Sequence, residues 1–248
     1  MLAGWRERGL SAAVAVDPAG PPAAGPEVMV VADAAAIPAG FTPAAVVLAV
    51  KPQHAAAVVP DYARFAPAAV FLSIMAGRSI AGLRSLLGGQ AAVVRAMPNT
   101  PAAVRQGITV ACAGPGVTAA QLALCDTLLA AIGAVAWIED EELIDPVTAV
   151  SGSGPAYVFL LAELLEQAAV EQGIPADLAR LLARQTVAGS GALLAASPED
   201  AAALRRAVTS PHGTTERALA VLMHDQAWPA LISGAVAAAT ARSRELAG

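Results

Sequence analysis

The segment VTSPHGTTERAL, residues 208–219, holds the densest group of residues that could do chemistry. Small and hydroxyl residues run directly into a predicted helix, so free backbone N–H groups and the positive end of the helix would face any anion that docks there. A carboxylate or a phosphate is the expected ligand. Thr214 and Thr215 each add a hydroxyl that could donate to it; alternatively, both hydroxyls cap the helix and contact no ligand.

A second candidate is Lys51, the only lysine of the chain, in the segment AVKPQ at residues 49–53. It follows a hydrophobic run typical of a parallel strand, and ligands of open α/β sheets bind at the carboxyl edge of such strands. A single lysine at this position, where every other Lys/Arg residue is arginine, indicates a binding role; alternatively, one lysine among 15 Lys and Arg residues arises by chance.

The segment AMPNTP, residues 96–101, follows another predicted strand, and its two prolines predict a rigid turn at the same sheet edge. Ser151 and Ser153 have no neighbouring His or Asp to activate them, which disfavours acyl transfer. His54, His212 and His224 lie far apart from one another and from both cysteines in sequence, so no metal site is expected.

Composition narrows the classes of function. The net charge is −5, without a Lys/Arg cluster, which disfavours nucleic acid and anionic membranes as partners. The apolar stretch 122–138 is interrupted by Asp126 and is shorter than the ~20 residues that span a bilayer, so no transmembrane helix is predicted. Two cysteines cannot form a disulfide framework, and residues 1–10 lack a secretory signal, which favours the cytoplasm.

Short β-branched runs alternate with alanine-rich stretches over residues 1–139, a pattern typical of a parallel sheet covered by helices. A Pro/Gly-rich segment, 18–26, is predicted to be a loop. The predicted strands are 12–16, 27–31, 44–50, 68–74, 91–97, 107–113 and 134–138.

From the acidic run at residue 139 onward, the pattern becomes helical throughout, so a second domain is expected over residues 140–248. Pro155 suits the first turn of a helix and Gly173 its C-terminal cap. The stretch 156–170 is apolar enough to need cover on more than one face, which a second copy of the chain would supply. At least a homodimer is expected.

Four segments in this order resemble pyrroline-5-carboxylate reductases: VVLAVKPQ, RAMPNTPAAVRQGIT, ELIDPVTAVSGSGPAY and LRRAVTSPHGTTERAL. The resemblance runs over nearly the whole chain. It implies an α/β fold, with a Rossmann-like NAD(P)-binding domain followed by an all-α dimerisation domain. It also implies hydride transfer from the nicotinamide to the C=N carbon of L-1-pyrroline-5-carboxylate, giving L-proline in the last step of proline biosynthesis.

The resemblance implies roles for individual residues. The substrate carboxylate would lie on the N–H groups of residues 212–215, and Thr215 would donate to the ring nitrogen as the catalytic residue. The implied substrate-binding residues are Glu141, Ser210, Gly213, Thr214 and Thr215. The implied cofactor-binding residues are Ala49, Val50, Lys51, Pro52, Ala96, Met97 and Pro98.

Cofactor preference depends on Asp17, at the end of the first predicted strand. A carboxylate there favours the free ribose of NAD and repels the 2′-phosphate of NADP, whereas the family leans to NADPH. NADP is therefore the first expectation and NAD the alternative.

The chain departs from the family pattern at three places, one of which is Ala207, where the family commonly has an Asn that would contact the cofactor. The family begins with a strand and a Gly-rich G-x-G-x-M turn, whereas residues 1–9, MLAGWRERG, resemble the helix after that turn. We therefore expect the true start to lie upstream of Met1. Where the family reads S-P-G-G-T-T, this chain has His212 in place of the first glycine. The histidine would be strained if that glycine needed a positive φ.

Two rival hypotheses remain. A hydroxyacid dehydrogenase of similar architecture would use a lysine in its helical domain, and this chain has no lysine beyond Lys51. The other rival is a truncated, catalytically inactive dimerisation or scaffold protein derived from the reductase family.

Overall fold

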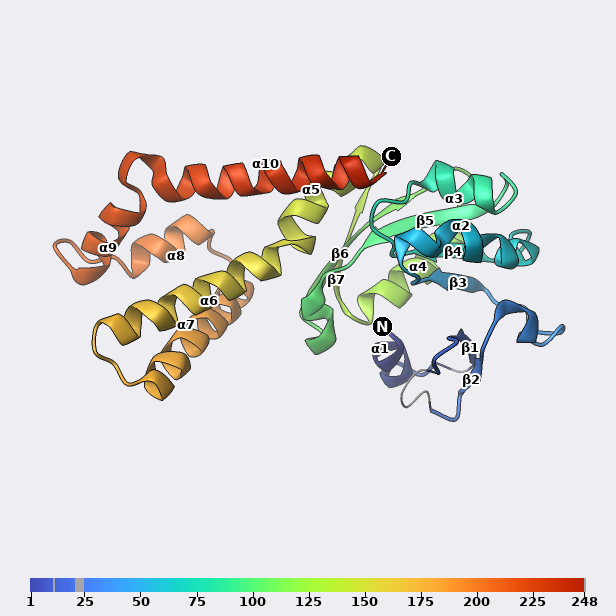
Figure 1. The fold of residues 1–248 in the computed structure, drawn as a ribbon, viewed down its shortest axis with the longest axis horizontal. Coiled ribbons are helices and arrows are strands. Elements are labelled where there is room, and N and C mark those ends of the chain that lie inside the picture. Colours follow the sequence, from blue (N-terminus) through green and yellow to red (C-terminus); the bar gives the residue numbers. More distant parts are fainter. Residues whose placement is uncertain (11, 21–24, 248) are drawn as a thin grey trace. The chain divides into compact units, whose positions relative to one another are not determined.

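The computed structural model describes residues 1–10, 12–20 and 25–247, and they divide into two compact units. Residues 1–152 and 239–248 form the first unit, and Ser153–Ala238 form the second. Figure 1 shows strands gathered in the first unit and helices in the second. The predicted Pro/Gly loop 18–26 is only partly described, because residues 21–24 lie outside these ranges.

Every predicted strand is confirmed, and the described residues hold seven. They are β1 Ala13–Val16, β2 Val28–Val31, β3 Ala45–Leu48, β4 Val70–Ser73, β5 Ala92–Met97, β6 Gly107–Ala113 and β7 Gly133–Ile138. β1 and β2 pair in parallel as a small sheet, and the other five form a sheet in the order β3-β4-β5-β6-β7. In the described residues, β3 therefore has a ladder partner on one side only.

One strand direction differs from the expected parallel sheet, because β6 is antiparallel to β5. The connection 98–106 contains only a short 3-10 helix, η4 Thr100–Val104, and a parallel crossover needs about a dozen or more residues. β6 and β7 are parallel again, joined through the helix α4 Ala119–Ala130.

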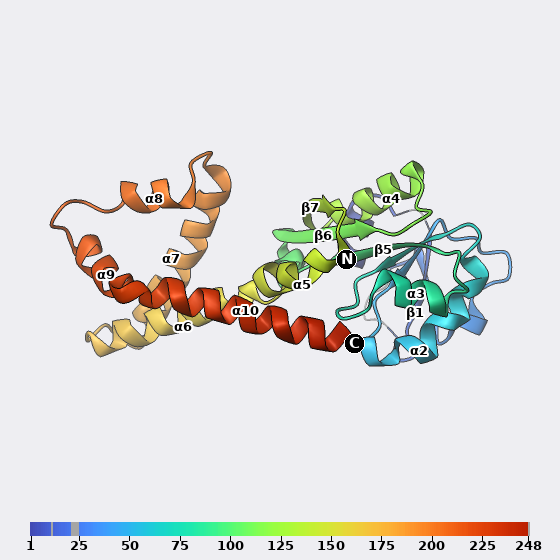
Figure 2. The same cartoon turned by 90° about the horizontal axis from the view of Figure 1, so that it is seen from above.

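Helices cover both faces of the larger sheet, as Figures 1 and 2 show. Alternate residues of one strand supply the two sides: Phe71 packs with α3 Ile80–Leu86, and Leu72 packs with α4. The remaining helical pieces of this part of the chain are α1 Leu2–Glu7, α2 Ala55–Val58, η1 Ala34–Ala36, η2 Pro52–His54 and η3 Val59–Phe65.

A helical run continues the first unit beyond β7. It comprises η5 Glu141–Leu143, α5 Ile144–Val147 and a π-helical turn, η6 Thr148–Gly152. Ile144 and Ala149 are fully buried, which fixes this run to the sheet. The last turns of α10 Ala227–Ala247 also belong to this unit, where the Ser243 hydroxyl donates to the buried Asp145 carboxylate at 2.6 Å.

The second unit is helical throughout, as expected. Its elements are α6 Gly154–Glu171, α7 Ala176–Ala196, α8 Ala201–Ala207, α9 Thr214–Leu222, η7 His224–Gln226 and the first part of α10. Pro155 stands in the first turn of α6, and Gly173 follows the helix with φ +85°, so both predicted end signals are confirmed.

The helices of the second unit expose large apolar side chains. On α6 they are Val158, Phe159, Leu160, Leu164, Leu165 and Val170, and on α7 they are Leu178, Leu181, Leu182, Leu193 and Leu194. By length and composition alone, the run Glu141–Glu171 would also suffice to cross a membrane, whereas the sequence predicted no transmembrane helix from the shorter stretch 122–138. These apolar faces need cover, as the sequence predicted for residues 156–170.

Candidate functional site

In the first unit, the candidate cofactor residues lie at the carboxyl edge of three parallel neighbours, β3, β4 and β5. Ala49, Val50, Lys51 and Pro52 continue from β3, and the Lys51 side chain is exposed. The turn closes where the His54 amide donates to the Lys51 carbonyl at 2.9 Å. Lys51 thus stands where ligands of open α/β sheets bind.

Beyond β5, the candidate residues divide between core and edge. The side chain of Ala96 packs in the core with Val94 and Leu129, so only its backbone is available to a ligand. Met97 and Pro98 are half-buried at the edge.

Asn99, in the segment that sequence analysis predicted to be a rigid turn, explains how that turn is held. Its side-chain amide donates to the Ser151 carbonyl at 3.1 Å, and its Oδ1 accepts from the Ile108 amide at 3.0 Å. The turn is thereby tied both to β6 and to the π-helical turn η6. A Cβ on Gly152 would stand 2.9 Å from the Met97 Cε, so glycine lets this backbone come close to Met97.

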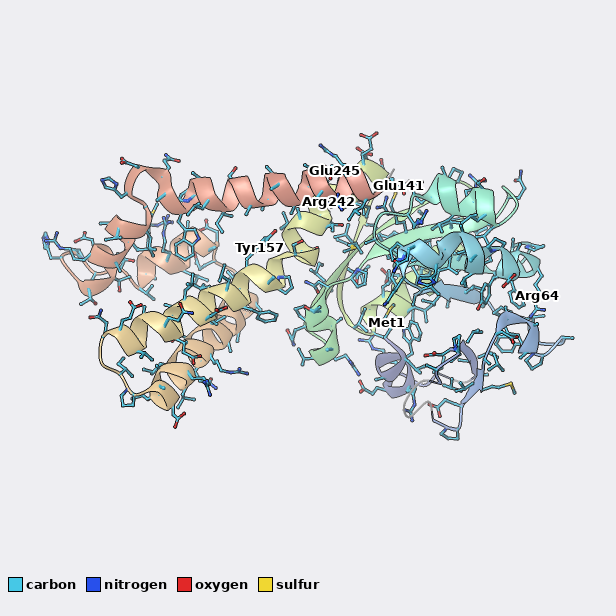
Figure 3. All side chains as sticks on the ribbon, in the orientation of Figure 1. Met1, Arg64, Glu141, Tyr157, Arg242 and Glu245 are labelled. Carbon is cyan, nitrogen blue, oxygen red and sulfur yellow. The ribbon has the colours of Figure 1, made fainter. Side chains whose placement is uncertain are left out.

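Glu141, labelled in Figure 3, has partners within the first unit. Its Oε1 accepts from the Arg95 guanidinium at 2.9 Å and from the Ile80 amide, in the first turn of α3, at 2.8 Å. Arg95 is only 4% exposed, so this carboxylate neutralises a buried charge. Burial, together with the charge of Glu141, raises the pKa of the neighbouring Cys112 thiol.

Asp17 follows β1 directly, as its sequence position predicted. Its Oδ1 accepts from the Ala19 amide at 2.9 Å, which holds the carboxylate at the carboxyl end of the small sheet. A carboxylate at this position can accept hydrogen bonds from ribose hydroxyls.

In the second unit, the candidate substrate residues form the entry to α9. Gly213 caps the helix without a side-chain hydrogen bond, and Thr214 and Thr215 follow in the first turn. The alternative that the two threonines are capping residues is therefore wrong. The amides of the first turn and the Thr215 hydroxyl are the donors that an anion would meet here.

His212 adopts the left-handed conformation, with φ +60°, so the strain anticipated at this position is present. Its amide donates to Glu216 Oε2 at 2.8 Å, and the Gly213 amide donates to the Ser210 carbonyl at 3.0 Å. A Cβ on Gly213 would stand 3.0 Å from that carbonyl, a tight contact that a larger residue could make only if the turn shifted slightly. The loop is thus shaped by its own backbone, with Ser210 and Gly213 as the two ends of one turn.

The structure groups the candidates by unit: Lys51, Pro52, Met97 and Pro98 at one sheet edge, and Ser210, Gly213, Thr214 and Thr215 at one helix start. Sequence reasoning missed Arg78, Arg95 and the contacts of Asn99. An arginine inside the apolar strand AAVVRAM was a usable signal, because a buried charge requires a partner.

Comparisons with known proteins agree on one family. A family model described as pyrroline-5-carboxylate reductase dimerisation matches residues 141–246. A pyrroline-5-carboxylate reductase of Pseudomonas aeruginosa is 44% identical over 203 residues, which are 82% of this chain and 74% of that protein.

Two solved structures extend the agreement to the fold. A pyrroline-5-carboxylate reductase from Coxiella burnetii aligns with a TM-score of 0.83 at 35% identity, over 89% of this chain and 82% of that one. The Plasmodium falciparum pyrroline carboxylate reductase, solved with NADP bound, aligns with a TM-score of 0.79 at 28% identity, over 92% of this chain and 86% of that one.

Proposed function

Since this chain belongs to the pyrroline-5-carboxylate reductase family, we propose that its named side chains carry out the reduction of L-1-pyrroline-5-carboxylate to L-proline. It is an NAD(P)H-dependent oxidoreductase with a Rossmann-like sheet and a helical dimerisation region. The observation that carries the assignment is the 44% identity over 203 residues to a reductase of this family.

The carboxyl ends of the strands offer groups that suit a nicotinamide dinucleotide. At the larger sheet, the Lys51 ammonium would meet phosphate charge and the turn at 49–52 would offer backbone groups. At the small sheet, Asp17 would offer a carboxylate to ribose hydroxyls. Ala96, Met97 and Pro98 complete the proposed lining, with Ala96 acting through its backbone. NADP is placed first because the P. falciparum relative binds it, and Asp17 makes NAD the alternative.

When bound, the reduced nicotinamide would supply a hydride to the C=N carbon, and the ring nitrogen would take up a proton from solvent, giving the secondary amine of the product. The entry to α9 would hold the substrate carboxylate on the amides of Thr214 and Thr215, because those of His212 and Gly213 already donate to Glu216 and to the Ser210 carbonyl; the helix dipole also favours negative charge there. Thr215 donates its hydroxyl to the ring nitrogen and so orients the imine. Ser210, Gly213 and Thr214 shape and line the same loop.

Glu141 enters the proposal with one oxygen already engaged. Because Oε1 holds Arg95 and the Ile80 amide, Oε2 is the oxygen left for a substrate contact. Glu141 therefore acts on the site partly by fixing the carboxyl end of β5 and the start of α3.

We propose a homodimer in which a second copy covers the apolar faces of α6 and α7. The family match over 141–246 supports a homo-oligomer, and the exposed apolar side chains of α6 and α7 give it a surface. This cover also accounts for the apolar run Glu141–Glu171 without a membrane. The two cysteines are free thiols, which suits the cytoplasm that we propose as the location.

The test is NADPH and NADH oxidation with L-1-pyrroline-5-carboxylate by the purified chain, and by a version extended with the codons upstream of Met1. Substrate-dependent oxidation by either version, with proline as product, supports the assignment. If neither version oxidises NADPH or NADH, and both are shown to be folded, the assignment as a reductase is overturned and the inactive scaffold is favoured.

A further inference from the structure

Arg78 lies in the connection between β4 and α3 and contacts the turn that follows β3. Its Nε and Nη2 both donate to the Pro52 carbonyl, at 2.9 and 2.7 Å. One guanidinium edge thus brackets a single backbone oxygen, an arrangement that the rigid fork of an arginine can make and the single ammonium of a lysine cannot.

The backbone on either side of Arg78 is fixed. Gly77 has φ +64°, and a Cβ there would stand 2.8 Å from the Leu246 carbonyl, so this position requires glycine. On the other side, the Ser79 hydroxyl caps α3 by accepting from the Gly82 amide at 3.1 Å, and the Ile80 amide donates to Glu141. Arg78 therefore extends from an immobile base.

The turn that Arg78 holds has few other ties. The ladder between β3 and β4 ends at the pair Leu48–Ser73, so residues 49–52 continue beyond it. Within the described residues, the hydrogen bonds that tie this turn to another connection come from the Arg78 guanidinium. Val50 packs against the core before the turn, but without the Arg78 bonds the exposed Lys51 and the Pro52 carbonyl would be held only by the local backbone bond from the His54 amide.

We propose that Arg78 is a positioning residue, which holds the Lys51–Pro52 turn in the conformation that the dinucleotide binds. The inference rests on the proposed function for the identity of the ligand, and it assigns to Arg78 an action through Pro52 rather than a contact with the reacting atoms. Loss of the bond lets the free turn sample other conformations, and the dinucleotide then has to restore the binding conformation at the expense of affinity.

The test compares Arg78→Ala and Arg78→Lys with Arg105→Ala. Arg105 is the matched control, because its Nε and Nη2 likewise make two hydrogen bonds, to Glu7 at 3.0 and 2.6 Å, away from this turn. For Arg78→Ala we expect KM for NADPH to rise about 10-fold, as for the loss of a charge-assisted hydrogen bond, with kcat unchanged. Arg78→Lys should fall between wild type and Arg78→Ala, and Arg105→Ala should keep the wild-type KM.

A second readout needs no turnover. Amide hydrogen exchange of the nucleotide-free chain should speed up at residues 50–54 in Arg78→Ala but not in Arg105→Ala, and calorimetric titration with NADPH should show the same loss of affinity as KM. Unchanged exchange in this turn, or a fall in kcat with KM unchanged, overturns the proposal. Failure of the wild-type chain to oxidise NADPH would count against the proposed function, while the exchange data would still decide whether Arg78 holds the turn.

Discussion

Thr215 stands in the first turn of α9. Its hydroxyl does not cap the helix, because the N-cap position is Gly213. Glu141 is the opposite case, a carboxylate already engaged by a buried arginine and a helix amide. Substitution of Thr215 should therefore change catalysis, and substitution of Glu141 should change stability.

Replacing Thr215 with Val keeps the shape of the side chain and removes the donor to the reacting nitrogen. We expect kcat to fall roughly 100-fold, as when one preorganised donor is removed, with little change in thermal stability. Steady-state kinetics and thermal melts measure the two effects. Thr127→Val, an exposed helical position on α4 whose hydroxyl bonds only to the Ala123 carbonyl, is the control and should retain full activity. Unchanged turnover in Thr215→Val would remove the residue from its proposed role.

Replacing Glu141 with Gln leaves the Arg95 guanidinium buried beside a neutral amide. We expect the free energy of unfolding to fall by roughly 2 kcal/mol, somewhat less than for a fully buried pair, because Glu141 is partly exposed. Urea denaturation measures it, with the exposed neighbour Glu142→Gln as control. A variant as stable as wild type would show that the pair contributes nothing to the fold.

The position of a residue could be predicted where it follows a strand, but not where its partner is a distant backbone group. The place of Lys51 at the sheet edge could be predicted because it follows an apolar run typical of a strand, while its role in binding stays a prediction. Arg78 could not, because its acceptor is a carbonyl in another connection, and carbonyls leave no mark in sequence. Arg95 signalled the need for a buried partner, but the pairing with Glu141 spans 46 positions and is decided by tertiary structure.

At the scale of elements, the strands were predictable because β-branched runs bounded by Gly and Pro mark them locally. The direction of β6 was missed, since periodicity does not encode direction; only the shortness of the connection 98–106 gave a signal. The π-helical turn η6 was likewise invisible, because SGSG is equally a good helix start.

The contact between α4 and the sheet has a pH signature. Cys125 is fully buried on the inner face of α4, and desolvation raises the pKa of its thiol from 9.0 to about 11. The unfolded chain therefore loses this proton at lower pH than the folded chain does, so the stability contributed by the protonated thiol is present below pH 9.0 and is lost as pH rises towards about 11. Unfolding curves between these values should show a steeper decline for wild type than for Cys125→Ala, and equal slopes would contradict the assignment.

For the assembly of the whole molecule, the decisive feature is the set of exposed apolar side chains on α6 and α7. α6, α7 and the groove of about 1040 Å³ between them carry Val158, Phe159 and Val170 beside Glu163, Glu166 and Arg180. Such a mixture of apolar centre and charged neighbours is typical of a surface that another subunit covers.

Phe159 is 65% exposed on α6, so a charge there should break the proposed dimer. We expect Phe159→Asp to raise the dimer dissociation constant roughly 100-fold, as for a central interface residue, and to shift the mass in light scattering towards one chain. Val104→Asp, at a 70% exposed position on η4 of the first unit, is the matched control and should keep the wild-type mass. An unaltered mass for Phe159→Asp would place the interface elsewhere.

A chain with one lysine, on an exposed turn at the edge of its sheet, is already prepared for site-selective labelling. An amine-reactive fluorophore would react with Lys51 and with the terminal amine of Met1, and peptide mapping separates the two products. Burial lowers the pKa of the Met1 amine. Nucleotide bound at the turn would shield Lys51 from acylation and leave Met1 as an internal standard. The composition of this protein thus provides a footprinting assay for its cofactor without any mutation.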